Sequence, residues 1–342
     1  MKPKADKRKG EGLPQAANMD GGPDGRCMCD DFVKATEAAA LEAARMRGQG
    51  EGAVAHRAAV DAMRKTLDAM AISARVTVGF GDRYGADGLI GGREVGAGGR
   101  RCELAVDALE GTESLARGQT GAMSVLAVAA PGNILPVPRM YMQKIVVGPR
   151  AAGSVDMDLP VSENLKAIAK AYDRPVKDIS VITLDRPRHE DLIEEIRATK
   201  ARIKLIPDGD ITASISAAVQ GTGDHVYIGI GGAPEGIMTA AAMRSLGGEI
   251  QARFWPLSRS EVEACQKLGI DDIEAKLSTD DMVKGDVVFS ATGVTRSDLL
   301  RGVFYFGHGA RTQTLVMCTR CRNVRFVDNI QLFTQERREI RL

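Results

Sequence analysis

The chain is poor in aromatic side chains and carries almost no net charge. Aromatic residues make up 4% of its 342 residues, and the formal net charge is +1. Proteins that bind nucleic acids use aromatic stacking and a basic field, so both shortages argue against that class. Long apolar runs are also missing. The longest, Ala122 to Pro131, is about half the roughly 20 residues of a membrane helix, so we expect no membrane span.

Cysteine is scarce as well, with six residues in the whole chain. So few cysteines do not form a disulfide scaffold, and they predict a reducing compartment, the cytoplasm or an organelle matrix. Four of them form two close pairs, Cys27/Cys29 and Cys318/Cys321, which together could bind zinc. Because the pairs lie almost a full chain apart and C-x-C is a poor spacing for structural zinc, the sequence favours free thiols.

What is present is the composition of a globular protein, with 44% hydrophobic and 27% charged residues. Residues 1–30 differ, because they are rich in Lys, Gly and Pro, and five of the first nine residues are Lys or Arg. We predict a basic tail without a core of its own. It is either a solvated end or an arm that contacts an anionic partner. The remainder predicts an α+β domain at 31–155 and an α/β domain at 156–342.

Hydrophobic periodicity predicts helices at 31–47 and 54–70 and a strand at 76–78. The stretches CELAVDALEGT, SVLAVAA and MQKIVVG are typical of further strands, and we expect the last two to pair within one sheet. After about Gly153 strands and helices alternate. This alternation predicts an α/β fold whose second sheet is largely parallel, with helices on both faces.

Asp107 and Glu110 are candidate metal ligands. They stand three residues apart in a turn after a predicted strand, and Gly111 and Thr112 follow them. Two carboxylates held together repel each other unless a cation neutralises them, and Mg²⁺ or Mn²⁺ is the natural occupant of an oxygen site. An exposed pair of acids that caps a helix would show the same pattern, so this stretch alone leaves both alternatives open.

Other polar residues follow predicted strands further along the chain. Glu235 comes after a glycine turn, in which Gly231 and Gly232 free backbone N–H groups to face an anion. A second set suits a phosphorylated sugar, since carboxylates accept hydrogen bonds from sugar hydroxyls and guanidinium groups bind phosphate; it comprises Asp208, Asp210, Arg186 and Arg188. His189, next to them, is expected to be a capping or surface residue rather than a ligand. The sequence has no P-loop motif, and the residues predict a metal-dependent sugar phosphatase.

These stretches resemble a known family. AVDALEGT, MYMQKIVVGP, RPRH, IPDGD, GIGGAPEG and FSATGVTRSDLL look like the class II, or GlpX-type, fructose-1,6-bisphosphatases of the lithium-sensitive phosphatase superfamily. The resemblance covers about residues 32–342. It implies a layered α/β/α/β/α sandwich with a mixed sheet in the first half. It also implies a role in gluconeogenesis and carbohydrate metabolism, through hydrolysis of the 1-phosphate of fructose 1,6-bisphosphate with Mg²⁺ or Mn²⁺.

The resemblance also assigns roles to residues of this chain. The family's metal carboxylates fall on Asp107, Glu110 and Glu235, and Thr112 matches the threonine that orients the attacking water, so Asp107 and Thr112 are the catalytic candidates. The positions that match substrate contacts are Gly111, Tyr141, Arg186, Arg188, Asp208, Asp210 and Gly232.

The first half of the family's metal site is altered in this chain. A metal-binding aspartate of the family falls on His56, and a metal-binding glutamate falls on Phe80. Imidazole is a poor ligand for Mg²⁺, and a phenyl ring is no ligand at all. Loss of two ligands would lower the rate by roughly 10⁴-fold or more. Asp82, two residues after Phe80, is a possible substitute.

These losses favour a catalytically impaired family member, a pseudoenzyme that serves as a structural or regulatory subunit of a larger assembly without a metal of its own. The alternative is an active fructose-1,6-bisphosphatase with a rebuilt metal site that uses His56 and Asp82. We expect a homo-oligomer or a subunit of a larger complex, with the basic tail as its contact arm. Its small-molecule partner, if the protein is active, is a sugar bisphosphate.

Overall fold

The computed structural model describes residues 27–80, 85 and 88–333. Most of the predicted basic tail and the candidate ligand Asp82 lie outside these residues. Within them, every helix is too short or too polar to traverse a lipid bilayer.

The helices of the described chain are α1 (Cys29–Ala44), α2 (Gly52–Asp68), α3 (Thr112–Ala116), α4 (Val161–Tyr172), α5 (Glu190–Ala198), α6 (Asp210–Ala218), α7 (Ala233–Leu246), α8 (Arg259–Lys267) and α9 (Thr279–Met282), with short 3-10 turns at η2 (Val176–Asp178) and η3 (Pro187–His189). Amphipathic periodicity places α1 and α2 within a few residues of where the sequence predicts them.

The strands are β1 (Ile72–Gly79), β2 (Glu94–Val95), β3 (Arg100–Glu110), β4 (Met123–Ala129), β5 (Tyr141–Val147), β6 (Ser180–Leu184), β7 (Arg202–Ile206), β8 (Val226–Gly232), β9 (Glu249–Trp255), β10 (Leu277–Ser278), β11 (Val287–Gly293), β12 (Phe304–Phe306), β13 (Gly309–Cys318) and β14 (Asn323–Leu332).

Two sheets organise these strands. The first has the order β12-β13-β11-β4-β3-β1-β2, with β14 also paired to β13, and the second has the order β10-β9-β5-β8-β6-β7. The expectation that β4 and β5 pair with each other is therefore wrong, since β4 lies in the first sheet and β5 in the second. The segment between them, 130–140, contains three prolines and is too long for a tight hairpin. It carries the chain from one sheet to the other.

The second sheet is mixed rather than largely parallel. Strand β6 runs parallel to β7 and β8, but β5 is antiparallel to both β8 and β9, and β10 is antiparallel to β9. Strand β5 arrives from the first sheet and not from a preceding helix of the second. A βαβ crossover therefore does not impose its direction.

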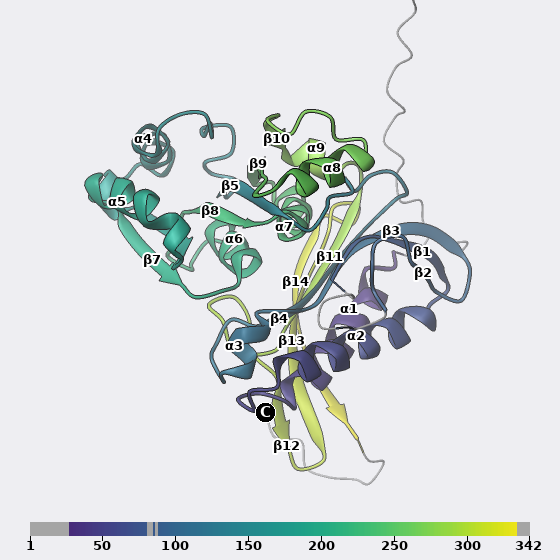
Figure 1. The fold of residues 1–342 in the computed structure, drawn as a ribbon. Coiled ribbons are helices and arrows are strands. Elements are labelled where there is room, and N and C mark those ends of the chain that lie inside the picture. Colours follow the sequence, from purple (N-terminus) through teal and green to yellow (C-terminus); the bar gives the residue numbers. More distant parts are fainter. Residues whose placement is uncertain (1–26, 81–84, 86–87, 334–342) are drawn as a thin grey trace, which may run out of the picture.

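The layers form the predicted α/β/α/β/α sandwich (Figure 1). Helices α1 and α2 cover the outer face of the first sheet, and α1 contacts β4, β11 and β13. Helices α6 and α7 fill the space between the two sheets, where α7 contacts strands of both. Helices α4 and α5 cover the far face of the second sheet (Figure 1).

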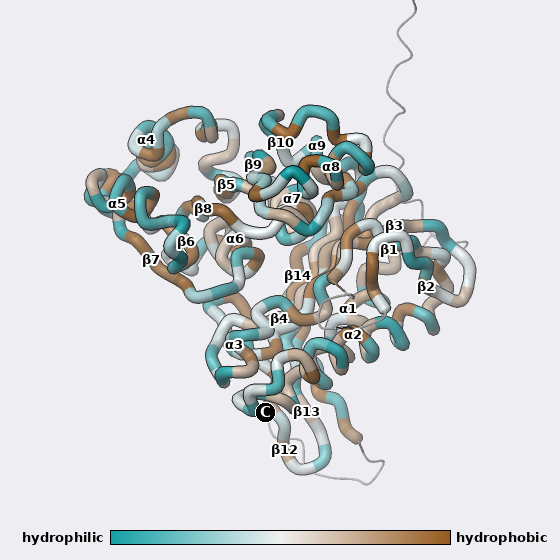
Figure 2. The backbone as a smooth tube through the Cα atoms, viewed as in Figure 1, coloured by the Kyte–Doolittle hydropathy of each residue, from teal (hydrophilic) through white to brown (hydrophobic). Residues whose placement is uncertain are grey.

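Three apolar cores match these layers. One joins α1 and α2 to the first sheet, one fills the middle layer, and one lies under α4 and α5. Along β3, Leu104 and Val106 belong to the outer core while Ala105 belongs to the middle one, as the period of two in a strand requires. The outer helices α2 and α5 alternate hydrophilic and hydrophobic residues along their length, so each has one face for the core (Figure 2).

The last strands return to the beginning of the fold. Strands β11, β13 and β14 belong to the first sheet, although they follow the whole second sheet in the chain. Sheet membership thus does not follow the division at residue 155, and the two predicted domains stay a prediction. The return places the end of the described chain beside α1.

Candidate active site

A bulge at the end of β3 brings two carboxylates to one face of the first sheet. Asp107 pairs with Val125 and Glu110 with Met123, and the register shifts between them. Residues three apart in a regular strand point to opposite faces, but the extra residue of a bulge resets this alternation. Because Met123 and Val125 both face the middle core, Asp107 and Glu110 face it too.

Two helices of the middle layer begin at these carboxylates. The backbone N–H of Ile211, in the first turn of α6, donates to Glu110 Oε1 at 2.9 Å. Glu235 lies in the first turn of α7. Helix N-termini stabilise negative charge because their N–H groups have no partner within the helix. The fold thus gathers the predicted metal carboxylates Asp107, Glu110 and Glu235 at one end of the middle layer.

The electrostatics of this cluster are unfavourable without a cation. Burial raises the pKa of Glu235 to about 8, Asp210 adds to the rise, and the Lys144 ammonium opposes it. Burial also raises the pKa of Glu110 well above its usual range, with a further contribution from Asp210, while the Ile211 N–H opposes the rise. Glu235 as a residue is partly exposed, but its Oε2 is buried without a hydrogen-bond partner among the described residues.

Glycines make room for the carboxylates. A Cβ on Gly232 would lie 1.9 Å from Glu235 Oε2, and a Cβ on Gly231 would lie 2.0 Å from Asp210 Oδ2. Gly111 takes a left-handed conformation, φ 75°, which turns the chain from β3 into α3. A side chain at Gly231 or Gly232 would displace the carboxylate that faces it, and a side chain at Gly111 would strain the left-handed backbone.

Thr112 is the first residue of α3 and is buried beside Glu110. Its hydroxyl donates to the carbonyl of Leu109 at 2.9 Å, so the hydrogen points away and the oxygen can still accept a hydrogen bond. This is the orientation that a residue needs to hold a water molecule by its proton.

Lys144 is a site residue that we did not predict. It is 3% exposed in the middle of β5 and forms a buried ion pair with Asp210. Its ammonium also donates to the carbonyl of Gly232 at 3.0 Å. A lysine inside the apolar strand MQKIVV is the signal that could have indicated it, because a buried lysine needs an anionic partner.

Asp208 and Asp210 have different surroundings although they are two residues apart. Asp210 is buried in its pair with Lys144, whereas Asp208 is partly exposed and accepts from the Gly209 N–H at 3.0 Å. Asp208 also borders a cavity of about 390 Å³, which Thr212, Lys204 and Arg296 line as well. Asp208 is therefore the more accessible of the two carboxylates.

The predicted phosphate-binding arginines lie on the same edge of the second sheet. The Arg188 guanidinium stacks over the Tyr141 ring, 4.7 Å from its centroid, and donates two hydrogen bonds to the Ile230 carbonyl. Arg186 is exposed. The fold thus places Tyr141 and Arg188 in contact. Two of the N–H groups of the Arg188 guanidinium bind the Ile230 carbonyl of β8.

His189, expected to be a capping or surface residue, stands at the N-cap position of α5 but is buried, with 1% of its surface exposed. Its Nε2 accepts the Ile230 N–H at 2.7 Å, so Nδ1 is the nitrogen that donates to the Leu184 carbonyl at 2.8 Å. Burial lowers its pKa, and the neutral ring ties the ends of β6 and β8 together.

The altered half of the site is packed into the protein interior. Phe80 is 5% exposed and belongs to the middle core. His56 is fully buried on α2. It lies one turn after Gly52, where a Cβ would meet the Thr112 side chain at 3.1 Å. His56 therefore lies on the helix face directed toward the carboxylates. The structure thus places apolar and imidazole rings at the two positions where the family resemblance expects carboxylates.

Comparison with known proteins agrees with this geometry. The sequence profile of the family described as bacterial fructose-1,6-bisphosphatase, glpX-encoded, matches residues 26–331. A protein of Synechococcus sp. (strain JA-2-3B'a(2-13)) is 41% identical over 329 residues, which cover 88% of this chain and 94% of the relative. It is named D-fructose 1,6-bisphosphatase class 2/sedoheptulose 1,7-bisphosphatase.

Two further relatives carry the same name. One, from Thermosynechococcus vestitus, is 38% identical over 91% of this chain and 98% of its own length. The other, from Synechococcus elongatus, is 39% identical over 89% of this chain and 95% of its own length. The carboxylate cluster, the layered fold and these similarities agree, and the chain belongs to the glpX-encoded, class II fructose-1,6-bisphosphatase family.

Proposed function

We propose that the protein is an active, metal-dependent phosphatase that hydrolyses a phosphate ester of a sugar bisphosphate. The buried carboxylate cluster of Asp107, Glu110 and Glu235 carries this proposal. Three acids in one buried place, with the pKa of Glu235 raised to about 8, are destabilising unless a cation neutralises them. The names of the relatives support fructose 1,6-bisphosphate and sedoheptulose 1,7-bisphosphate as substrates.

The donor atoms suit a hard divalent cation. Carboxylate oxygens are the ligands that Mg²⁺ and Mn²⁺ prefer, and Oε2 of Glu235 is buried with no hydrogen bond among the described residues. The three side chains still have to close around an ion. In the described part of the chain, the one group of potential ligands whose atoms all lie within 4.8 Å of one another is a cysteine group elsewhere. Repulsion between like charges is a sufficient reason why the carboxylate oxygens of Asp107, Glu110 and Glu235 lie further apart than these sulfur atoms.

The residues around the cluster have distinct tasks in this proposal. A divalent cation held by these carboxylates would neutralise phosphate charge and would make a water molecule a better nucleophile. Thr112, whose hydroxyl donates to Leu109 O, accepts a hydrogen bond from the attacking water and orients it toward the phosphate. Asp107 holds the cation from the bulge of β3. Lys144 keeps Asp210 in place through their buried ion pair.

Substrate recognition falls to the opposite side of the cluster. Arg186 is exposed and offers a guanidinium to the phosphate that is not cleaved. Tyr141 and Arg188 form a stacked wall, and Asp208 accepts hydrogen bonds from sugar hydroxyls. Backbone N–H groups at Gly111 and Gly232, next to the starts of α3 and α7, face the phosphate being transferred.

The impaired-subunit hypothesis rests on His56 and Phe80. Similarity across nearly the full chain to proteins named as bisphosphatases favours the active alternative instead. We therefore propose that the three carboxylates alone bind the essential cation, and that His56 and Phe80 restrict the site to fewer ions. The predicted oligomer, the contact arm and the cytoplasmic or organelle-matrix location stay predictions.

The test is phosphate release from fructose 1,6-bisphosphate and from sedoheptulose 1,7-bisphosphate, measured with Mg²⁺ and with Mn²⁺. We expect turnover with at least one of the two ions, and a loss of about 10³-fold or more in Glu235→Gln, because a ligand to the cation is removed. Glu113→Gln is the matched control. Its carboxylate is 59% exposed on α3 beside the site, so the variant should keep full activity.

If neither substrate is turned over with either ion, the proposal of an active phosphatase is wrong and the hypothesis of a catalytically impaired family member is favoured. Turnover that survives Glu235→Gln would show that the chemistry lies elsewhere.

A further inference from the structure

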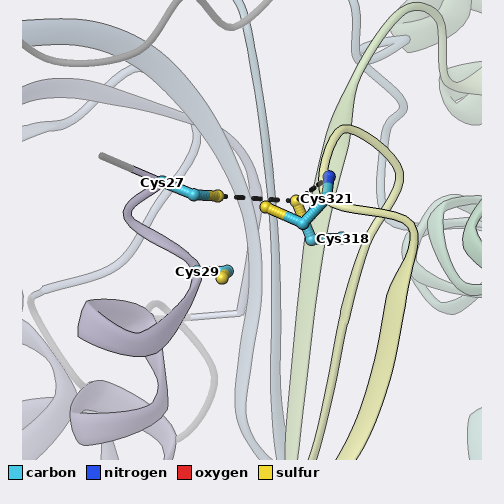
Figure 3. Close-up of side chains that lie close together, drawn as sticks. All are labelled: Cys27, Cys29, Cys318 and Cys321. Atoms are coloured by element: carbon cyan, nitrogen blue, oxygen red, sulfur yellow. Dashed lines mark hydrogen bonds between the residues drawn. The ribbon is translucent and has the colours of Figure 1, made fainter. Parts of the chain in front are cut away.

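Four cysteine side chains converge where the start of α1 meets the turn between β13 and β14 (Figure 3). The sulfur atoms of Cys27, Cys29, Cys318 and Cys321 all lie within 4.8 Å of one another. The return of β13 and β14 to the first sheet brings the two pairs together, although 291 positions separate Cys27 from Cys318. The sequence distance that argued against a shared site is thus removed by the fold.

The C-x-x-C pair occupies the tip of a hairpin. Cys318 ends β13 and pairs with Asn323, which begins β14. In the turn between them, the backbone N–H of Cys321 points at Cys318 Sγ at 3.4 Å. Arg322 completes the turn in a left-handed conformation, φ 53°. A backbone N–H directed at sulfur favours the thiolate, the form of cysteine that binds metals.

The C-x-C pair lies at a helix N-terminus. Cys29 is the first residue of α1, and Cys27 lies two residues before it. The positive end of the helix dipole lowers the free energy of a thiolate there. Arg325 adds a charged donor, since its Nη2 lies 3.4 Å from Cys29 Sγ while the same guanidinium pairs with Asp30.

Two further arginines lie near the cysteine group. Arg100 and Arg320 line a small cavity together with Cys27 and Cys318. Four thiolates around a divalent cation carry a net charge of −2, and such a group is stable in a protein only when nearby donors and cations compensate it. Arg100 on β3, Arg325 on β14 and Arg320 in the hairpin turn supply that compensation.

The distances decide between a metal site and a disulfide. The sulfur atoms of Cys27 and Cys318 lie 3.6 Å apart, whereas a disulfide has a bond of about 2.05 Å. A tetrahedral zinc ion with Zn–S bonds of about 2.3 Å separates its sulfur ligands by about 3.8 Å. All four cysteines are free thiols.

We propose that Cys27, Cys29, Cys318 and Cys321 form a structural zinc site that joins the start of α1 to the β13–β14 hairpin. Four thiolates in a closed tetrahedral arrangement select Zn²⁺ over the hard cations of the carboxylate cluster. The site closes a loop that contains nearly the whole enzyme, which restricts the unfolded chain. It also anchors the end of the predicted basic tail, which contains Cys27 and Cys29. The proposal does not depend on the proposed phosphatase activity.

The primary test is the metal content of the full-length protein, purified without chelator and measured by inductively coupled plasma mass spectrometry. We expect one zinc ion per chain, retained in Glu235→Gln and absent from Cys318→Ser. Cys102→Ser and Cys265→Ser are matched controls, because these two cysteines are also buried but lie outside the group. Both should keep their zinc.

A second measurement needs no variant. In the native protein, the four thiols should resist alkylation until a chelator is added, and Co²⁺ in place of zinc should give the absorption bands of a tetrahedral sulfur site. Removal of the ion should lower the melting temperature by about 5 °C or more. Thiols that alkylate without chelator, thiols that react only after reduction, or stoichiometric iron in place of zinc would each overturn the proposal.

Discussion

The two halves of the candidate active site differ in what surrounds their key positions. At Asp107, Glu110 and Glu235, a strand bulge and two helix starts direct carboxylates into one buried place. At His56 and Phe80, the corresponding space is part of the protein interior, and Phe80 packs in the middle core. Under the proposed function, rings fill the volume of two ligands of a metal site while the fold is retained.

Each half is held by a different kind of interaction. The carboxylate half depends on polar contacts, such as the hydrogen bond from the Ile211 N–H to Glu110 and the Lys144–Asp210 ion pair. A divalent cation bound there should therefore stabilise this half. The altered half depends on apolar burial, so a charge introduced there should be costly. Three experiments test this contrast.

The largest effect should follow from restoring the altered half. With a chelator present, the double substitution His56→Asp and Phe80→Glu should lower the free energy of unfolding by about 3–5 kcal/mol, because it buries two unpaired carboxylates. Mn²⁺ should recover part of this loss by binding between them. Urea denaturation in EDTA and in Mn²⁺ measures both quantities.

Phe80→Leu is the control for the double substitution. It shortens the side chain without adding charge, so it should cost only about 1 kcal/mol and show no response to Mn²⁺. If the double variant were as stable as the parent in EDTA, the altered half would not be an apolar region, and the contrast between the two halves would fail.

A smaller effect should follow from crowding the carboxylate half. Gly232→Ala places a Cβ 1.9 Å from Glu235 Oε2, which moves the flexible carboxylate rather than the backbone. We expect kcat/KM to fall by about 10²-fold, because a ligand displaced by about 1 Å no longer holds the reacting groups in line. The melting temperature should change little.

Gly91→Ala is the matched control, since a Cβ there meets only the Thr77 carbonyl at an ordinary 3.5 Å. It should leave kcat/KM unchanged. An equal loss in both variants, or none in Gly232→Ala, would mean that the position of the Glu235 carboxylate does not matter for turnover.

The smallest effect concerns pH. Burial raises the folded-state pKa of Glu235 to about 8, well above the usual glutamate value of 4.5. Between these values the native protein holds a proton that the unfolded chain has lost, so stability is highest at low pH and falls as the pH rises. Without metal, we expect a fall of about 2–3 kcal/mol between about pH 5 and pH 7.

Thermal or urea unfolding in EDTA across this pH range measures the slope. Glu235→Gln should reduce the slope but not abolish it, because the pKa of Glu110 is also raised. Glu113→Gln should leave the slope unchanged, and saturating Mg²⁺ should remove it by stabilising the ionised carboxylates. A stability that rises with pH in EDTA would contradict the assignment of a raised pKa.

Much of the architecture could be predicted because it is local. The period of three to four in α2 reflects burial on one helix face, and the alternation in β3 reflects two faces that pack into different cores. A short window of sequence records both patterns. The presence of Asp107, Glu110 and Glu235 after strands indicated their shared edge in the same way. The absence of carboxylates at positions 56 and 80 is a property of the sequence alone.

The sequence by itself thus determined the secondary structure, the family and the chemistry available to the site. Tertiary structure decided three other matters. It placed β4 and β5 in different sheets, it added the bulge that turns Asp107 and Glu110 to one face, and it brought Cys27 within 3.6 Å of Cys318. Each depends on contacts between residues far apart in the chain. Such contacts form when many apolar surfaces are buried together, and no local pattern in the sequence records which distant segments will meet.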